Sequence, residues 1–174
     1  MGDPAGLLEE ILELHADADK WAGCRFEKIR RIPNTKVGDV GQDFLERLCA
    51  ECELSTKFPE NKLGKRSKQS PWDIEIDGRK FELKTATEDV HNKFQFNHIR
   101  YHRPYDAVIC LGIAPSDVFF GMWCKADIAT GKAGVMVSME KAANASYKLT
   151  KSRASLHPIG QFEAELRKFL ADQS

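Results

Sequence analysis

The sequence has no long hydrophobic run. No stretch approaches the ~18 uninterrupted apolar residues of a membrane-spanning helix. The N-terminus also lacks the basic flank and the small-residue cleavage site of a secretory signal peptide. Because 42% of the 174 residues are hydrophobic, the chain can still bury a core without disulfides. We therefore expect a cytoplasmic protein with no membrane partner.

Cysteine is scarce and irregularly spaced. The five cysteines form an odd set, three of them inside apolar runs, which favours reduced core thiols over a disulfide framework. Cys49 and Cys52 form a lone CxxC pair, and a structural zinc site needs two further ligands at matching spacing. His98 and His102 are the alternative ligands, four residues apart on an expected helix. Core packing is the simpler interpretation of both cysteines.

Three common motifs are absent as well. The chain contains no GxxxxGK[ST], GxGxxG or GxSxG. A P-loop nucleotide hydrolase, a dinucleotide-binding protein and an α/β-hydrolase therefore lose their usual sequence support. We expect no small-molecule substrate.

The sequence has no net charge, because 26 basic and 26 acidic residues cancel. Residues 1–23 nevertheless hold six acids and one lysine, which leaves 25 basic and 20 acidic residues in the rest of the chain. Leu7, Ile11, Leu14 and Trp21 recur at helical spacing in this segment, after an Asp-Pro start. We expect an acidic amphipathic helix that packs on its own domain or serves as a dimerisation element. The mildly basic remainder leaves a nucleic-acid partner open.

Apolar periodicity predicts one α/β domain over residues 1–174, with a central mixed sheet flanked by helices. The expected helices after the N-terminal one span residues 39–54, 94–101 and 157–170. The expected strands span residues 72–76, 79–86, 105–113 and 117–126.

Asp77-Gly78 joins the first two of these strands and is a favoured sequence for a two-residue hairpin turn. A hairpin closed there places Ile74 opposite Phe81 and Asp73 opposite Glu82. Because side chains alternate across a strand, we expect one apolar face and one polar face. The polar face would carry Asp73, Glu75, Lys80, Glu82 and Lys84.

Asp73 and Glu82 are then two carboxylates whose Cβ atoms lie about 5 Å apart. They repel each other unless a cation lies between them, and oxygen ligands favour Mg²⁺, Mn²⁺ or Ca²⁺ over zinc. Lys84 would place an ammonium on the same face, where it can orient a metal-bound water or stabilise negative charge on a phosphate. The alternative is an ordinary solvated strand face, where cross-strand ion pairs such as Glu75 with Lys80 need no function.

Pro71-Trp72-Asp73 followed by Glu82-Leu83-Lys84 resembles the PD-(D/E)xK nuclease superfamily. In that superfamily an acid on one strand and an acid-x-lysine on the next form a metal site. Trp72 interrupts the literal Pro-Asp pair. The resemblance covers about residues 38–125 and is strongest to compact type II restriction endonucleases and the related mismatch-repair nickase.

The upstream segment VGQDFLERL is similar to a VGQ-acid helix of the nickase group, although Glu46 falls one residue later than that group's glutamate. The resemblance implies a restriction-endonuclease-like core and assigns a role to five residues. Asp73 and Glu82 would bind metal, Lys84 would be the catalytic lysine, Leu83 would be a carbonyl ligand, and Glu46 would be an accessory acid.

Two segments are candidates for contact with DNA. KFPENKLGKRSK, residues 57–68, is a basic loop that suits phosphate, unless it is only a solvated loop. HNKFQFNHIRYHR, residues 91–103, carries polar side chains that read base edges, unless it is an amphipathic helix with a solvated polar face. The resemblance places recognition residues in this second segment. The candidate contacts are Lys62, Lys65, Arg66, Lys68, Asn92, Lys93, Gln95, Asn97 and His98.

These observations predict a Mg²⁺-dependent DNA endonuclease, most like a type II site-specific deoxyribonuclease, in which Mn²⁺ can replace Mg²⁺. Its reaction would be phosphodiester hydrolysis by a metal-activated water. A small enzyme covers little double-stranded DNA alone, so we expect a homodimer. Two alternatives stay open: a structure-directed repair or recombination nuclease, and a catalytically silent nucleic-acid-binding module.

Overall fold

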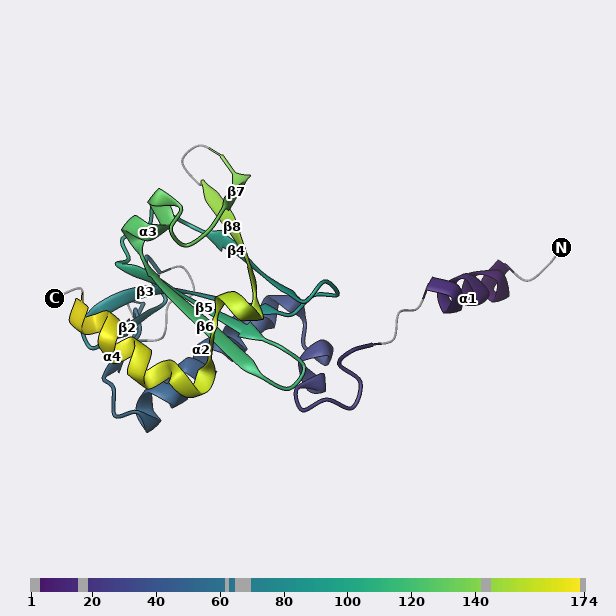
Figure 1. Ribbon diagram of the computed structural model, residues 1–174, viewed down its shortest axis with the longest axis horizontal. Helices are drawn as coiled ribbons and strands as arrows, with labels where there is room; N and C mark the ends of the chain where they lie inside the picture. Colours follow the sequence, from purple (N-terminus) through teal and green to yellow (C-terminus); the bar gives the residue numbers. More distant parts are fainter. Residues whose placement is uncertain (1–3, 16–18, 62, 65–69, 142–144, 173–174) are drawn as a thin grey trace.

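The computed structural model describes residues 4–15, 19–61, 63–64, 70–141 and 145–172 (Figure 1). The α-helices are α1 (Pro4–His15), α2 (Asn34–Glu51), α3 (Lys125–Thr130) and α4 (Phe162–Asp172). The strands are β1 (Thr56–Lys57), β2 (Ile74–Ile76), β3 (Arg79–Thr87), β4 (Lys93–Ile99), β5 (Ala107–Ile113), β6 (Val118–Cys124), β7 (Met136–Glu140), β8 (Ser146–Ser152) and β9 (His157–Pro158). Short 3₁₀ helices include η1 (Glu27–Arg31), η3 (Arg153–Ser155) and η4 (Ile159–Gln161).

The larger sheet has the strand order β1-β2-β3-β5-β6-β9. β3 and β5 run parallel while the other neighbours are antiparallel, so the sheet is mixed. β5, with the sequence AVICLGI, is buried along its whole length, as a continuous apolar run predicts for a central strand. The predicted α/β class, with a mixed sheet and helices, is confirmed.

Two apolar cores lie on the two faces of this sheet. On one face, Phe81 and Leu83 of β3 pack with residues of α2 and α4 such as Leu45. On the other face, Cys110 of β5 packs against a smaller sheet of order β4-β8-β7 that includes Phe96. Figure 1 shows α2 and α4 on one side of the large sheet and the small sheet on the other. The chain is therefore layered, and β3 and β5 contribute to both cores.

The predicted helix over residues 94–101 is wrong, because this segment forms β4. Phe94 and Phe96 are fully buried, while Gln95 and Asn97 are exposed. Residues two apart lie about 200° apart around a helix but share one face of a strand. The alternating pattern of the segment is therefore a strand pattern, and the proposed pairing of His98 with His102 on a helix falls with the helix.

Two predicted helix boundaries also move. α2 begins at Asn34, directly after Pro33, five residues before the predicted start at Asp39. The closing helix begins only at Phe162, because residues 157–161 form β9 and η4 instead. The predicted strands correspond to β2, β3, β5 and β6.

The apolar positions of the expected N-terminal helix are divided between two places. Trp21 is buried with Ile29 and Ile113 in a small core of the main body, whereas α1 ends at His15 and lies apart from that body in Figure 1. Its leucines are exposed. No helix among the described residues is long and apolar enough to span a membrane.

All five cysteines are free thiols, as the sequence predicted. Burial, and then the nearby Cys52, raise the pKa of Cys49 to about 12. Burial likewise raises the pKa of Cys110. These thiols are therefore neutral parts of the core at physiological pH.

Candidate active site

The hairpin of β2 and β3 carries the predicted catalytic residues. Its register pairs Ile74 with Phe81 and Glu75 with Lys80, as predicted. Asp77 and Gly78 both have positive φ, 45° and 84°, which is the backbone that a type I′ turn requires. The local sequence therefore fixes which residues of the two strands face each other.

Asp73 lies just before β2 and forms hydrogen bonds with β3 and with α2. Its Oδ2 accepts a hydrogen bond of 2.8 Å from the backbone N–H of Leu83. Its backbone carbonyl accepts a hydrogen bond of 3.1 Å from Nε2 of Gln42 on α2. The Asp73 carboxylate therefore lies at the peptide group that joins Glu82 to Leu83, next to the second predicted metal ligand.

Glu82 is completely buried, with 0% of its surface exposed. Its Oε1 lies 2.6 Å from Nζ of Lys84 and 3.4 Å from the backbone N–H of Arg100, which follows β4. Its Oε2 has no hydrogen-bond partner among the described residues. An ordinary strand face would leave this glutamate in water, so the solvated-face alternative does not describe it.

Burying a carboxylate costs several kcal/mol unless charge and hydrogen bonds compensate. Lys84, whose side chain is only 18% exposed, compensates one oxygen of Glu82. The other oxygen, and the Asp73 carboxylate that is bound to the backbone of Leu83, offer hard oxygen ligands to a cation. Because Mg²⁺ is commonly held by one or two carboxylates and several waters, this pair fits a Mg²⁺ or Mn²⁺ ion.

No group of three or more His, Cys, Asp or Glu side chains that could hold a metal occurs within the described parts of the chain. Any metal held by the hairpin would thus rest on two side chains, and these ligands do not suit zinc. Cys49 and Cys52 do not gain the further ligands that a zinc site needs in the described ranges.

Tyr105 is a neighbour of this site that the sequence did not single out. Its hydroxyl is buried and has no hydrogen-bond partner in the described part of the chain. Burial and then the negative charge of Glu82 raise the pKa of Tyr105. The phenol therefore stays protonated and can act only as a neutral donor.

Glu46, the accessory acid expected on α2, is connected to the hairpin less directly than Asp73, Glu82 and Lys84 are. Gln42 of α2 donates the hydrogen bond to the Asp73 carbonyl, and Glu46 lies one helical turn further along. Glu46 is partly buried. Its role as an accessory acid stays a prediction, as does that of the Leu83 carbonyl as a ligand.

The predicted DNA contacts fall into two groups. Lys62, Lys65, Arg66 and Lys68 lie outside the described residues. Residues 92–98 lie at and along β4 in the smaller sheet, which packs against β3 of the hairpin. The exposed members of this second group are Asn92, Lys93, Gln95, Asn97 and His98.

In the small sheet, β4 lies beside β8, which carries Lys148 and Lys151. β4 pairs with β8, so that Lys93 lies opposite Ser152 and Gln95 opposite Thr150. Gln95 also donates a hydrogen bond of 2.9 Å to Asp89. The outward side of the small sheet thus gathers amides, hydroxyls and lysines, while its phenylalanines fill the core.

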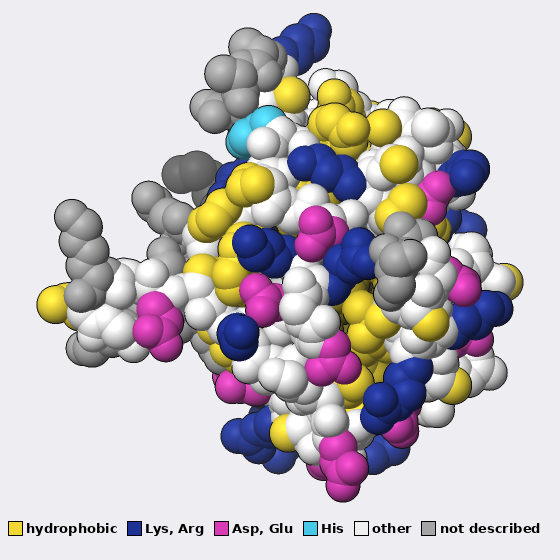
Figure 2. All heavy atoms as spheres, turned by 90° about the vertical axis from the view of Figure 1, so that its left-hand side faces the viewer, with side chains coloured by type: hydrophobic (Ala, Val, Ile, Leu, Met, Phe, Trp, Pro, Cys, Tyr) yellow, Lys and Arg dark blue, Asp and Glu magenta, His cyan; other side chains and the backbone are white. Residues whose placement is uncertain are grey.

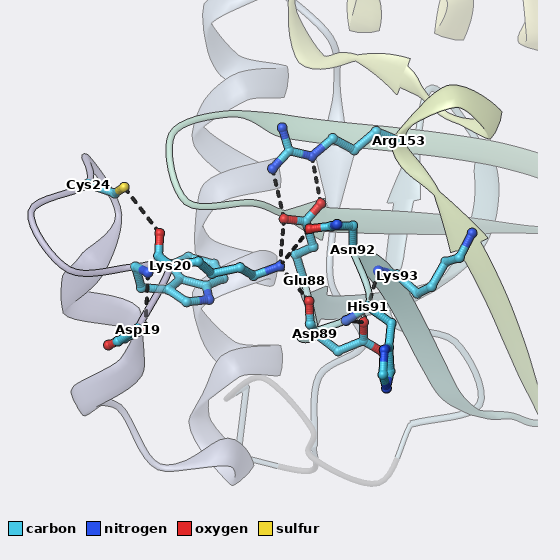
Figure 3. A network of polar contacts seen from close by, with 10 residues as sticks. Asp19, Lys20, Cys24, Glu88, Asp89, His91, Asn92, Lys93 and Arg153 are labelled. Atoms are coloured by element: carbon cyan, nitrogen blue, oxygen red, sulfur yellow. Dashed lines mark hydrogen bonds and ion pairs between the residues drawn. The ribbon is translucent and has the colours of Figure 1, made fainter. Parts of the chain in front are cut away.

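Sequence reasoning missed a second buried glutamate at the far end of β3. Glu88 accepts hydrogen bonds of 2.6 and 2.7 Å from Nε and Nη2 of Arg153, and its Oε2 lies 2.9 Å from Nζ of Lys20 (Figure 3). Lys20 also donates to the Asp89 carbonyl and, at 3.2 Å, to Asn92. The bonds from Arg153 and Lys20 hold the pKa of Glu88 below its usual value, against the effect of burial. No local pattern indicates this cluster, because its members lie 65 and 68 residues from Glu88.

The face that carries the end of α4 mixes both signs of charge. Figure 2 shows Lys and Arg side chains interspersed with Asp and Glu over apolar surface there. The side chains coloured in that view form no continuous basic surface. This face therefore offers no single-sign field to a phosphate backbone.

Comparison with protein-family models and with curated proteins finds no match to this chain.

Proposed function

We propose that this chain is a Mg²⁺-dependent DNA endonuclease of the PD-(D/E)xK type, with its catalytic core in residues 38–125. The observation that carries the proposal is the Glu82 carboxylate. It is fully buried, one oxygen is held by Lys84, and the other has no hydrogen-bond partner in the described ranges, while the Asp73 carboxylate is bound to the backbone N–H of the next residue, Leu83. A bound cation would compensate that oxygen.

In this proposal Asp73 and Glu82 hold the metal, and Leu83 keeps the Asp73 carboxylate in place through its N–H. Bound Mg²⁺, or Mn²⁺ on the same ligands, would supply an activated water as the nucleophile for phosphodiester hydrolysis. Lys84 keeps its ammonium against Glu82, where its positive charge would stabilise the negative charge that grows on the phosphate in the transition state.

Gln42 acts as a positioning residue by holding the Asp73 backbone from α2. We assign double-stranded DNA as the substrate and a type II restriction endonuclease as the enzyme class. Residues of β4 would read base edges, since Asn97 and Gln95 are exposed and carry amides that pair with bases. A homodimer would present two hairpins to the two strands of a duplex.

The test is cleavage of supercoiled plasmid and phage DNA by the purified chain with Mg²⁺, Mn²⁺ or Ca²⁺, followed by sequencing of the product ends. We expect discrete fragments with Mg²⁺ and Mn²⁺ and none after chelation. Asp73→Asn should be inactive. Glu75→Gln is the matched control, because Glu75 lies on the same hairpin but pairs with Lys57 at 3.5 Å.

The same experiment separates the alternatives. Cleavage that depends on branched or mismatched substrates, without a sequence at the ends, would identify a structure-directed nuclease. An absence of metal-dependent cleavage on all these substrates, with DNA binding retained, would identify a catalytically silent binding module and overturn the proposal.

A further inference from the structure

Helix α1 exposes an apolar face that has no cover in the described structure. At 100° per residue, its five large apolar side chains fall within an arc of about 160°. All five are exposed: Leu7, Leu8, Ile11, Leu12 and Leu14. A helix of this length is marginal in water on its own, because most helix stability in proteins comes from packing. The face therefore requires an apolar partner surface.

The main body has a groove of about 710 Å³ between η1, α2 and the turn that joins β5 to β6. Its lining is largely apolar and includes Ile32, Val40, Phe44 and Ile159. Phe44 is 37% exposed, which leaves part of its ring open to a ligand. A hydrophobic groove of this kind accommodates the apolar face of an amphipathic helix.

The charges of the helix and of the groove are complementary. Glu9, Glu10 and Glu13 lie around the other side of α1, which carries no Lys or Arg. The sequence RFEKIRR, residues 25–31, has four bases and one acid, and two of these bases lie in the groove lining, which also includes Asp117. Arg25 and Lys28 line the groove and are exposed. Pairing α1 with another α1 would instead bring together like charges.

We propose that α1 of one copy docks in this groove of a second copy, and that the exchange is reciprocal. The chain is held to the body at Lys20 and Trp21, since Trp21 is buried and Lys20 is bound to Glu88, while α1 itself lies away from its own body (Figure 1). A reciprocal exchange uses the same contact twice and closes as a two-fold dimer. The proposal does not depend on the nuclease assignment, because its measurements involve no DNA or metal.

The first measurement is the molar mass of the full chain by sedimentation equilibrium over a range of concentrations, at low and high salt. We expect a concentration-dependent dimer whose dissociation constant rises with salt, because acidic and basic surfaces meet in it. A chain that stays monomeric at all concentrations would overturn the proposal, including the case in which α1 folds back on its own groove. A dimer that becomes tighter with salt would overturn it in favour of α1–α1 pairing.

The second measurement locates the contact with variants of exposed residues. Ile11→Asp should weaken dimerisation on the order of ten-fold or more, since it places a charge on the apolar face. Combined Arg25→Glu and Lys28→Glu should weaken it as well, and adding Glu9→Lys and Glu10→Lys should restore most of the affinity. Circular dichroism of each variant verifies that the body is folded.

Glu13→Lys is the matched control, because Glu13 lies at the middle of the polar side, farthest from the apolar arc, and its substitution brings the same charge change as Glu9→Lys or Glu10→Lys singly. It should leave the dissociation constant within about three-fold of the parent value. The assignment of the groove would be overturned if the combined charge reversals on the helix and the groove failed to restore affinity. It would also be overturned if Glu13→Lys weakened the dimer as much as the double variant Glu9→Lys/Glu10→Lys does in an otherwise unchanged chain.

Discussion

Glu82 lies within β3 and Glu88 directly follows it, and both are buried, yet their surroundings differ. Both oxygens of Glu88 are held by side-chain cations, Arg153 at 2.6 and 2.7 Å and Lys20 at 2.9 Å (Figure 3). Glu82 has a single cation, Lys84, on one oxygen. Glu88 thus forms a closed cluster, in which both oxygens are compensated, whereas Glu82 forms an open one, in which one oxygen has no hydrogen-bond partner among the described residues.

The difference distinguishes a structural role from a chemical one. A closed ion cluster ties segments together: Glu88 joins the chain before η1, through Lys20, to the end of β8, through Arg153. An open cluster retains electrostatic cost in the folded protein, which a cation can remove on binding. The comparison therefore predicts opposite consequences when each carboxylate is neutralised.

The largest effect should follow Glu82→Gln. Cleavage should fall on the order of 10³-fold or more, since the amide removes a negatively charged ligand from the proposed metal site. The melting temperature in chelator should hold or rise slightly, because the buried charge is gone. Asp73→Asn should behave alike. Activity is measured by plasmid cleavage and stability by thermal unfolding, and a fully active Glu82→Gln would contradict the assignment.

Glu88→Gln should show the opposite pattern. Loss of a buried partner leaves two cations uncompensated, and we expect unfolding to become easier by about 3 kcal/mol, at the low end for such pairs because Lys20 and Arg153 reach solvent. The folded fraction should cleave DNA at nearly the parent rate. Denaturant unfolding gives the free energy of unfolding, and cleavage by the same preparation gives the activity. An unchanged free energy of unfolding would show that the Glu88 cluster does not stabilise the fold.

The pH dependence sharpens the same contrast. The folded-state pKa of Glu88 lies below the ordinary value of 4.5, so its ionised form stabilises the native state. This contribution is fully present above the unfolded-state pKa and is lost as the pH falls through the lower folded-state pKa. The stability difference between the parent and Glu88→Gln should therefore be constant near neutral pH and shrink below about pH 4.5. Thermal unfolding from neutral to acid pH measures it.

Lys84→Ala should have an intermediate effect on the open cluster. The cleavage step should slow on the order of 10²-fold, because the ammonium acts on the transition state and is not an oxygen ligand. DNA affinity with Ca²⁺ in place of Mg²⁺ should stay near the parent value. Single-turnover kinetics separates these two effects, and a defect in affinity alone would make Lys84 a phosphate clamp.

The open cluster was predictable from sequence and the closed one was not. Asp77-Gly78 and the alternating strands fix the hairpin over a dozen residues, so the neighbourhood of Asp73, Glu82 and Lys84 is a local property. What the pattern did not indicate is that the smaller sheet buries Glu82 from the polar side. The Glu88 cluster requires the packing of segments far apart in the chain, which periodicity cannot supply.

The error at residues 94–101 has a related cause. The mixture of polar and aromatic residues was interpreted as one helical face, whereas Phe94 and Phe96 at a spacing of two favour a strand. The strand then places Gln95 and Asn97 together on the exposed side. This correction keeps both residues as candidates for base contact, now on a sheet rather than a helix.

The smallest effects concern the proposed base contacts. The hydrogen bonds near Glu88 predict which of these contacts contributes more to sequence discrimination. Gln95 donates to Asp89 beside Glu88, whereas the exposed Asn97 side chain has no such hydrogen bond within the described residues. Asn97→Ala should therefore reduce discrimination between cognate and single-mismatch DNA by ~1–3 kcal/mol, and Gln95→Ala by less. Lys93→Ala is the control: it should weaken all sequences alike and lower the slope of log affinity against log salt by about one unit. Salt titrations with Ca²⁺ in place of Mg²⁺ measure binding without cleavage. If Asn97→Ala changes the salt slope and leaves discrimination intact, β4 contacts the DNA backbone, and sequence reading must lie elsewhere in the protein.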